Sequence, residues 1–298
     1  MKNNIAVIGL GSMGYGIATS CLRSGHLVWG VDTNIDQVKA FCSQGGQATT
    51  LNSVIDKIDV VVVVVLNSVQ TEEVLFGQEG LVENLKPGTV VISCATVAPT
   101  FAIDMERRCK EFEIFYLDAP ISGGALKAKN GQLSIMASGV KEAFQHARPT
   151  LDSISETVFE LGDEAGTGSA MKSVNQLLAG VHIAVMAEAL TFGISQGISP
   201  DKFVEVISKC AGTSWMLENR APHIVNGDYK PHSSINIWPK DLGIVLDVAL
   251  ESKFNAPIAT AALEQFRTAV DMGLGFEDDA AVAKVYAKSA NLSLPKKK

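Results

Sequence analysis

Three glycines near the start of the chain have the spacing of a phosphate-binding turn. The segment Gly9-Leu10-Gly11-Ser12-Met13-Gly14 follows the apolar run Ile5–Gly9 and leads into a helical pattern over Ser12–Ser24. In such a turn the first glycine allows the tight bend, the second lets a pyrophosphate approach the backbone, and the third lets the helix pack on the strand. Amides at the helix N-terminus then face the phosphates. The spacing therefore predicts a dinucleotide site.

A carboxylate after the next strand indicates which dinucleotide. Asp32 directly follows the apolar run Leu27–Val31. A carboxylate there accepts hydrogen bonds from both adenosine ribose hydroxyls and repels a 2′-phosphate, and the following Thr33-Asn34 carry no positive charge. The predicted cofactor is therefore NAD rather than NADP. A second interpretation of Asp32, as the cap of a helix that begins at Ile35, is compatible with the first.

Polar groups also follow two further predicted strands. The run Val60–Leu66 is apolar at every position, as in a strand covered on both faces, and Asn67 comes directly after it. Thr96 follows the strand Thr89–Ser93. Open α/β sheets bind ligands at the carboxyl ends of their strands, so we expect Leu66, Asn67 and Thr96 to line the cofactor site, with Asn67 near the nicotinamide ribose.

A glycine pair after the strand Ile114–Asp118 could hold an anion. The hydroxyl of Ser122 and the amides of Gly123 and Gly124 would form a small nest for a substrate carboxylate. A plain glycine turn into the next strand, Leu133–Ala137, explains the same residues. Both interpretations stay open at this point.

Lys172 is the leading candidate for acid–base chemistry. It stands on the first turns of a long apolar helical pattern, which follows the turn-rich segment Gly162–Gly168 and runs to about Ser195. Asn175 lies three residues further on and so shares a face with Lys172. Most helical lysines face solvent, but a lysine near the start of so apolar a helix is better explained by a site. Burial near the positive charge of a cofactor would lower the pKa of this lysine from about 10.4. The amine could then exchange protons with a hydroxyl near neutral pH.

Lys240 is a second cation in an unexpected place. It stands at the start of a predicted helix, where positive charge is mildly unfavourable. Either it serves a site, or it pairs with Asp241 or another acid. The five histidines show no ligand spacing with cysteine or carboxylate, so no metal site is predicted.

Composition bounds the class of protein. The chain has 298 residues, 25 basic and 32 acidic, and its net charge of −7 argues against nucleic-acid or anionic-membrane partners. Five cysteines spread singly favour a reducing cytoplasm, and no signal peptide is expected before Ile5. The apolar stretch from Val174 to Ile194 is long enough to span a bilayer, but Asn175, Gln176, His182 and Glu188 interrupt it. We therefore expect a helix buried between domains or subunits.

Two domains are predicted. Short β-type runs alternate with helical stretches up to a last strand near Thr157–Leu161, which is the pattern of a parallel sheet wrapped by helices. Beyond Gly162–Gly168 only helix-length periodicity remains. Ser199-Pro200 marks one helix start, with serine as the cap and proline at the first helical position.

Together these motifs resemble those of the β-hydroxyacid dehydrogenases, which include 3-hydroxyisobutyrate dehydrogenase and tartronate semialdehyde reductase. The resemblance runs from Ile5 to about Tyr286 and rests on four motifs in the family's order: Gly9–Gly14, Asp118–Gly124 with Lys127-Ala128, Gly166–Gln176, and Lys240-Asp241-Leu242. It implies an α/β fold in which a Rossmann-type NAD-binding domain, here 1–163, is joined by a long helix to an all-α substrate and oligomerisation domain, here 164–298. It also implies a homodimer or homotetramer.

The resemblance assigns roles to the site residues. Lys172 would be the catalytic acid/base, Asn175 would orient the substrate, Ser122–Gly124 would hold its carboxylate, and Lys240 would close the site near the nicotinamide. The family often has two successive hydroxyl residues where this chain has Ala95-Thr96, which leaves Thr96 as the one hydroxyl at this point.

Within the family, three segments are most similar to the enzymes that oxidise L-threonate: Gly212–Met216, Asn219–Ile224 and Gly227–Tyr229. The predicted function is NAD-dependent oxidation of a short hydroxy acid, L-threonate to 2-dehydro-L-erythronate (2-oxo-tetronate). Oxidation of 3-hydroxyisobutyrate and reduction of tartronate semialdehyde are the alternatives within the enzyme class. A dinucleotide-binding sensor without turnover is an alternative of another class, and the intact Lys172, Asn175 and Lys240 argue against it.

Overall fold

The computed structural model describes residues 2–48 and 50–297, and it divides into two compact units, residues 1–172 and 173–298. The first unit is α/β and the second is all-helical, as predicted. The division falls inside one long helix, α7 (Thr167–Ser195), which begins in the first unit and continues into the second.

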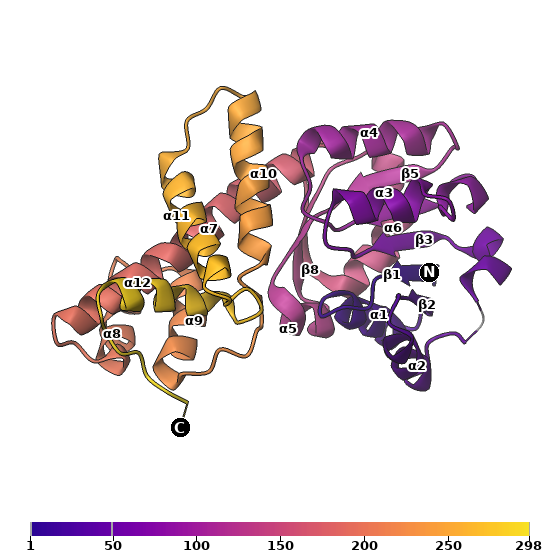
Figure 1. The fold of residues 1–298 in the computed structure, drawn as a ribbon. Helices are drawn as coiled ribbons and strands as arrows, with labels where there is room; N and C mark the ends of the chain where they lie inside the picture. Colours follow the sequence, from indigo (N-terminus) through magenta and orange to yellow (C-terminus); the bar gives the residue numbers. More distant parts are fainter. Residues whose placement is uncertain (1, 49, 298) are drawn as a thin grey trace. The chain divides into compact units, whose positions relative to one another are not determined.

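The first unit is built on a parallel sheet of five strands in the order β2-β1-β3-β4-β5 (Figure 1). Its strands are β1 (Asn4–Ile8), β2 (Leu27–Val31), β3 (Val60–Val63), β4 (Val90–Ser93) and β5 (Phe115–Asp118). The chain passes from β1 to β2 on one side and then crosses to β3 on the other. This reversal of direction is the point at which open α/β sheets bind ligands.

Helices cover both faces of this sheet, because alternate strand residues point to opposite sides. Val60 and Val62 pack in the core under α1 (Gly14–Arg23) and α6 (Lys141–Ile154). Val61 and Val63 pack in the core under α3 (Ser68–Phe76) and α4 (Pro99–Lys110). The predicted double-sided burial of this strand is therefore confirmed. The remaining helix of the crossovers is α2 (Ile35–Ser43).

Three strands form a separate second sheet, which corrects the expectation of one parallel sheet. β6 (Ile121–Ser122) pairs antiparallel with β7 (Leu133–Ala137), and β7 pairs parallel with β8 (Ser155–Glu160). A short helix, α5 (Gly124–Asn130), connects β6 to β7. The sequence pattern gave no sign of β6. The expected strand Val60–Leu66 is shorter in the structure, where β3 ends at Val63.

The second unit is a bundle of helices around its own core. After α7 come α8 (Pro200–Ile207), α9 (Trp215–Asn226), α10 (Ile237–Glu251), α11 (Pro257–Asp271) and α12 (Ala283–Ser289). Trp238 of α10 stacks on Phe266 of α11 with ring centroids 5.5 Å apart. Ser199 caps α8 by accepting a hydrogen bond from the amide of Lys202, and Pro200 follows it, as predicted. Short 3₁₀ segments lie at Leu51–Ser53, Ile55–Lys57, Val82–Asn84 and Asp279–Val282.

α7 is long and apolar enough, by length and composition alone, to cross a membrane. Within the second unit, however, Ile183, Met186, Ala187 and Leu190 of this helix are buried in the core of the bundle. This burial accounts for much of the apolar character of α7, because a core helix passes the same test as a membrane span.

Candidate dinucleotide and substrate site

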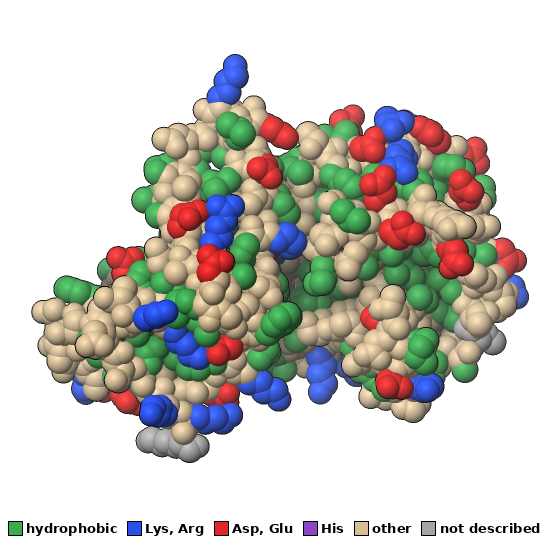
Figure 2. All heavy atoms as spheres, in the orientation of Figure 1, with side chains coloured by type: hydrophobic (Ala, Val, Ile, Leu, Met, Phe, Trp, Pro, Cys, Tyr) green, Lys and Arg blue, Asp and Glu red, His purple; other side chains and the backbone are tan. Residues whose placement is uncertain are grey.

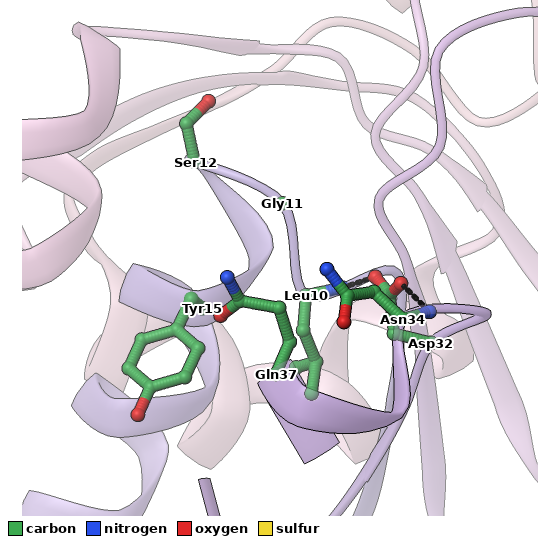
Figure 3. A pocket seen from close by; sticks show the side chains of 7 residues that line it. All are labelled: Leu10, Gly11, Ser12, Tyr15, Asp32, Asn34 and Gln37. Carbon is green, nitrogen blue, oxygen red and sulfur yellow. Dashed lines mark hydrogen bonds between the residues drawn. The ribbon is translucent and has the colours of Figure 1, made fainter. Parts of the chain in front are cut away.

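The glycine-rich turn and the end of β2 form a pocket in the first unit (Figure 3). Its volume is about 280 Å³, and it is lined by Leu10, Gly11, Ser12, Tyr15, Asp32, Asn34 and Gln37. The turn between β1 and α1 supplies one wall, and the segment from β2 to α2 supplies the other. Residues that the sequence analysis singled out separately, Gly11 and Asp32, thus line one hollow.

The three glycines of the turn are glycine for different reasons. A Cβ added to Gly14 would lie 1.8 Å from the carbonyl oxygen of Gly9, and one added to Gly9 would lie 2.4 Å from the carbonyl oxygen of Val64. A Cβ added to Gly11 would meet no atom within 4 Å. The fold itself therefore requires Gly9 and Gly14. Gly11 instead leaves bare backbone beside the pocket, which fits the close approach of a pyrophosphate.

Asp32 ties the turn to the end of β2. Its Oδ2 accepts a hydrogen bond from the Leu10 amide at 2.6 Å, and its Oδ1 accepts one from the Asn34 amide at 2.7 Å (Figure 3). A carboxylate has about four lone-pair sites, so acceptor capacity remains for ribose hydroxyls. The helix-cap interpretation of Asp32 was wrong, because Asn34 caps α2 by accepting from the amide of Asp36.

Leu66 and Asn67 form the loop between β3 and α3. Asn67 caps α3, since its Oδ1 accepts from the Gln70 amide, and the Gln70 side chain accepts from the Leu66 amide in return, both at 2.9 Å. This reciprocal pair fixes the loop at the carboxyl end of β3. Thr96 lies half-buried in the corresponding loop after β4. Contact of these three residues with a cofactor stays a prediction.

Ser122 ends β6, and the two glycines after it have positive φ. The φ angles are +133° at Gly123 and +75° at Gly124, where α5 begins. A Cβ at Gly123 would also meet the side chain of Lys127 at 2.8 Å. Turn geometry thus explains both glycines, and the anion nest stays a prediction.

Lys172 lies in the first turns of α7 and is buried, with 7% of its surface exposed. Its Nζ donates a hydrogen bond to the carbonyl oxygen of Ile121 at 2.8 Å. Because Ile121 directly precedes Ser122, the amine lies beside the segment that was predicted to hold a carboxylate. The solvent-facing position usual for helical lysines is therefore not the one found.

Asp118, to which no separate role was assigned from the sequence, fixes the start of α7. Its Oδ2 accepts from the amides of Gly166 and Ser169 at 3.0 and 2.7 Å, and its Oδ1 accepts from the Ser169 hydroxyl at 2.6 Å. Burial raises the pKa of this carboxyl, against the opposing effect of the bonds from Ser169. Such a carboxylate satisfies helix N-terminal amides and so positions the turn that carries Lys172. Its sequence signals were an acid at the end of a predicted strand and its place in the motif Asp118–Gly124.

In the second unit, Asn175 and Lys240 belong to one hydrogen-bonded chain. Asn175 Nδ2 donates to Gln176 Oε1 at 2.9 Å, and Gln176 Nε2 donates to Asp241 Oδ2. Lys240 Nζ lies 2.8 Å from Asp241 Oδ1. The pairing of Lys240 with Asp241, which the sequence left open, is therefore present, whereas the sequence analysis did not foresee the bond between Gln176 and Asp241.

The polar residues of α9 are engaged in packing. Arg220 pairs with Asp279, whose carboxylate also accepts from the indole of Trp238, and His223 pairs with Asp278 at 2.8 Å. Both aspartates are fully buried. Packing therefore accounts for Arg220 and His223 without a substrate. Among the residues that the structure describes, no group of three or more potential ligands is arranged to hold a metal ion.

Comparison with known proteins places this geometry in a family. The NAD-binding domain of 6-phosphogluconate dehydrogenase matches residues 4–162, and the NAD-binding domain of NADP-dependent 3-hydroxyisobutyrate dehydrogenase matches residues 166–286. The L-threonate dehydrogenase of Cupriavidus necator is 46% identical over 96% of this chain and 97% of its own, and the 2-(hydroxymethyl)glutarate dehydrogenase of Eubacterium barkeri is 34% identical over 97% of each chain. The crystal structure of a 3-hydroxyisobutyrate dehydrogenase from Salmonella typhimurium matches with a TM-score of 0.90 at 40% identity, covering 95% of this chain and 100% of that one. The chain is an NAD-binding dehydrogenase of hydroxy acids and belongs to the β-hydroxyacid dehydrogenase family.

Proposed function

We propose that this protein oxidises L-threonate to 2-dehydro-L-erythronate with NAD. Five relatives named L-threonate dehydrogenase, which are 42–46% identical over at least 95% of this chain, support the substrate. The observation that carries the chemistry is the buried amine of Lys172, held against the carbonyl of Ile121 beside Ser122–Gly124. In this proposal the amine is the base, and the neighbouring segment holds the carboxylate of the hydroxy acid.

The first unit has the groups that would hold NAD, which supplies the hydride acceptor when bound. The bare backbone at Gly11 and the amides that begin α1 would take the pyrophosphate. Asp32 would accept from the adenosine ribose hydroxyls. In this proposal Leu66, Asn67 and Thr96 complete the cofactor contacts.

Lys172 would act on the substrate hydroxyl. A carbinol carbon gives up hydride as its hydroxyl loses a proton, so a base within hydrogen-bond reach of that oxygen accelerates the step. In this proposal the neutral amine of Lys172 takes the proton. Ser122 with the amides of Gly123 and Gly124 holds the carboxylate, while Asn175 and Lys240 orient the substrate.

A substrate panel tests the proposed function. NADH formation is measured with L-threonate, D-threonate, erythronate, 3-hydroxyisobutyrate and glycerate, and the panel is repeated with NADP. Turnover confined to L-threonate with NAD is the expected result. Turnover mainly with 3-hydroxyisobutyrate, the activity named for the Salmonella typhimurium structure, would keep the mechanism and overturn the substrate. Binding of NAD with no turnover of any acid would favour a sensor.

Replacement of the proposed base gives a second test. Lys172→Ala is expected to lower kcat roughly 10²- to 10⁴-fold, as is typical for loss of a general acid–base, while the Kd for NAD changes little. Lys141→Ala is the matched control, because this exposed lysine lies at the start of α6. Near-normal turnover by Lys172→Ala would show that Lys172 is not the base.

We further propose that the protein works as a homodimer or homotetramer in the cytoplasm. Support for self-association comes from α7, on which Val174, Leu178, Val185 and Phe192 are each at least half exposed and lie along one face. Its five free cysteines fit a reducing compartment.

A further inference from the structure

The chain that links Asn175 to Lys240 has a buried middle and more accessible ends. Its two middle members, Gln176 and Asp241, are 7% and 3% exposed. The end members are Asn175, which is half-buried, and Lys240, whose side chain is 32% exposed. The chain also joins two helices of the same unit, because Asn175 and Gln176 belong to α7 while Lys240 and Asp241 belong to α10.

The chemistry of the donors and acceptors gives this chain a direction. A carboxylate only accepts hydrogen bonds and an ammonium only donates them. Asp241, whose Oδ2 takes the bond from Gln176 and whose Oδ1 faces the ammonium group of Lys240 in an ion pair, therefore requires Gln176 to turn its NH₂ group toward it. Gln176 must then offer its oxygen to Asn175, which donates through Nδ2. The amide of Asn175 is left with its oxygen and one N–H for other partners.

We propose that Asp241 and Gln176 are positioning residues that fix the amide of Asn175 so that its oxygen accepts from a substrate hydroxyl. A polyhydroxy acid is rich in such donors. The same carboxylate holds Lys240 in place. The identity of the hydroxyl rests on the proposed function, whereas the direction of the chain is a property of the protein alone.

Asp241→Asn tests the direction, because asparagine keeps the shape and offers one acceptor and one donor. In this variant the amide oxygen at position 241 stays turned toward the ammonium group of Lys240, so its NH₂ group faces Gln176. Gln176 must reverse, and Asn175 must reverse in turn, which replaces the acceptor facing the substrate by a second donor. Because the substrate hydroxyl then loses the acceptor for its proton, we expect kcat/KM for L-threonate to fall roughly tenfold. The KM for NAD should change less.

A double variant separates direction from mere loss of packing. In Gln176→Glu with Asp241→Asn, the new carboxylate at 176 accepts from both the asparagine at 241 and Asn175, so the original direction returns. We expect kcat/KM to recover most of the loss and to exceed that of either single variant. Asp247→Asn, an exposed aspartate on the same helix, is the matched control. A double variant that folds with the wild-type melting temperature but shows no recovery would overturn the proposal.

A measurement without substrate keeps this test independent of the proposed function. In protein labelled with ¹⁵N-asparagine, the side-chain NH₂ of Asn175, assigned from Asn175→Ala, should show one proton shifted downfield and protected from exchange. The signal should move in Asp241→Asn and return in the double variant. An unprotected Asn175 amide in the wild type would refute the chain even if the single variant failed to fold. Failure of L-threonate turnover with a protected amide would instead refute only the substrate.

Discussion

At the residue scale, Asp32 has two roles, one in the glycine-rich turn and one in cofactor choice. The substitution Asp32→Asn tests the second. As a carboxylate, Asp32 holds the turn through the Leu10 amide, and it would also bind the adenosine ribose. Asp32→Asn keeps one acceptor, which can serve Leu10, but loses the negative charge and the bond from the Asn34 amide. We expect the KM for NAD to rise roughly tenfold, in line with loss of a charged hydrogen bond, and the KM for NADP to fall because repulsion of its phosphate is removed.

Steady-state kinetics with both cofactors check this expectation, and a melting curve shows whether the turn is intact. An unchanged ratio of the two kcat/KM values would refute the role of Asp32 in cofactor choice.

Asp118 gives a second prediction at this scale, which concerns pH. Burial raises the pKa of Asp118 in the folded protein above its ordinary value of 3.8. The folded state thus binds this proton more tightly than the unfolded state does. The contribution of Asp118 to stability is fully present below its unfolded pKa and is lost as pH rises through its folded pKa. In Asp118→Asn that dependence disappears.

Urea unfolding at a series of pH values from 3.5 upward, roughly the unfolded pKa of an aspartate, measures this difference. The free energy of unfolding of the wild type relative to Asp118→Asn should decrease with rising pH over this acidic range. Asparagine can still accept from the Gly166 and Ser169 amides, so the variant should fold. A difference that increases with pH would contradict the raised pKa.

The glycine turn offers a prediction at the scale of elements, since its glycines serve packing and ligand approach separately. Gly14→Ala would push a methyl group into the Gly9 carbonyl, so we expect a marked loss of melting temperature. Gly11→Ala meets nothing in the protein and should leave the melting temperature unchanged, yet weaken NAD binding. Calorimetry and an NAD titration distinguish the two. Equal NAD affinity in Gly11→Ala and wild type would show that the pyrophosphate does not approach this residue.

The elements also show what sequence could and could not predict. The turn and α7 were predictable because their signals are local: a glycine spacing in one, and an apolar helical period interrupted by Lys172 in the other. β6 was missed because it has two residues, too few for any period. The sequence analysis extended β3 too far because Val64 and Val65 are still apolar, although the register of β3 with β1 ends at Val63 and the next two residues lie beside Gly9.

The sequence did not predict the hydrogen bonds between residues that are far apart in the chain. The Asp118–Ser169 bond joins residues 51 apart, and the Gln176–Asp241 bond joins residues 65 apart. Each is created by packing of elements, and no periodicity or spacing signals it. The sequence therefore indicated Lys172, Asn175 and Lys240, but the bonds from Asp118 to Ser169 and from Gln176 to Asp241 are seen only in the structure.

At the scale of the whole molecule, charged side chains of both signs are mixed, whereas exposed apolar side chains form a stripe along α7. Figure 2 shows acidic and basic side chains interspersed on the face drawn. Arg107 of α4 pairs with Asp104 and with Glu111, which directly follows this helix, and such exposed pairs contribute little to stability. The net charge of −7 agrees with small-molecule chemistry. The exposed stripe on α7 is the feature that solvation alone does not explain.

This stripe leads to a prediction about assembly. Leu178, Val185 and Phe192 repeat every seventh residue, which places them along one side of α7, where they could pack against the same helix of a second copy. Leu178→Glu with Phe192→Glu should convert an oligomer into a monomer, because burying two carboxylates at a subunit contact is costly.

Sedimentation or light scattering measures the mass, and circular dichroism should show that the monomer stays folded, since these side chains are 50% and 65% exposed within one chain. Lys209→Glu, an exposed charge change in the same unit, serves as the control. A wild-type protein that is already monomeric would refute the proposed assembly. An oligomer that survives both substitutions would instead move the subunit contact away from α7.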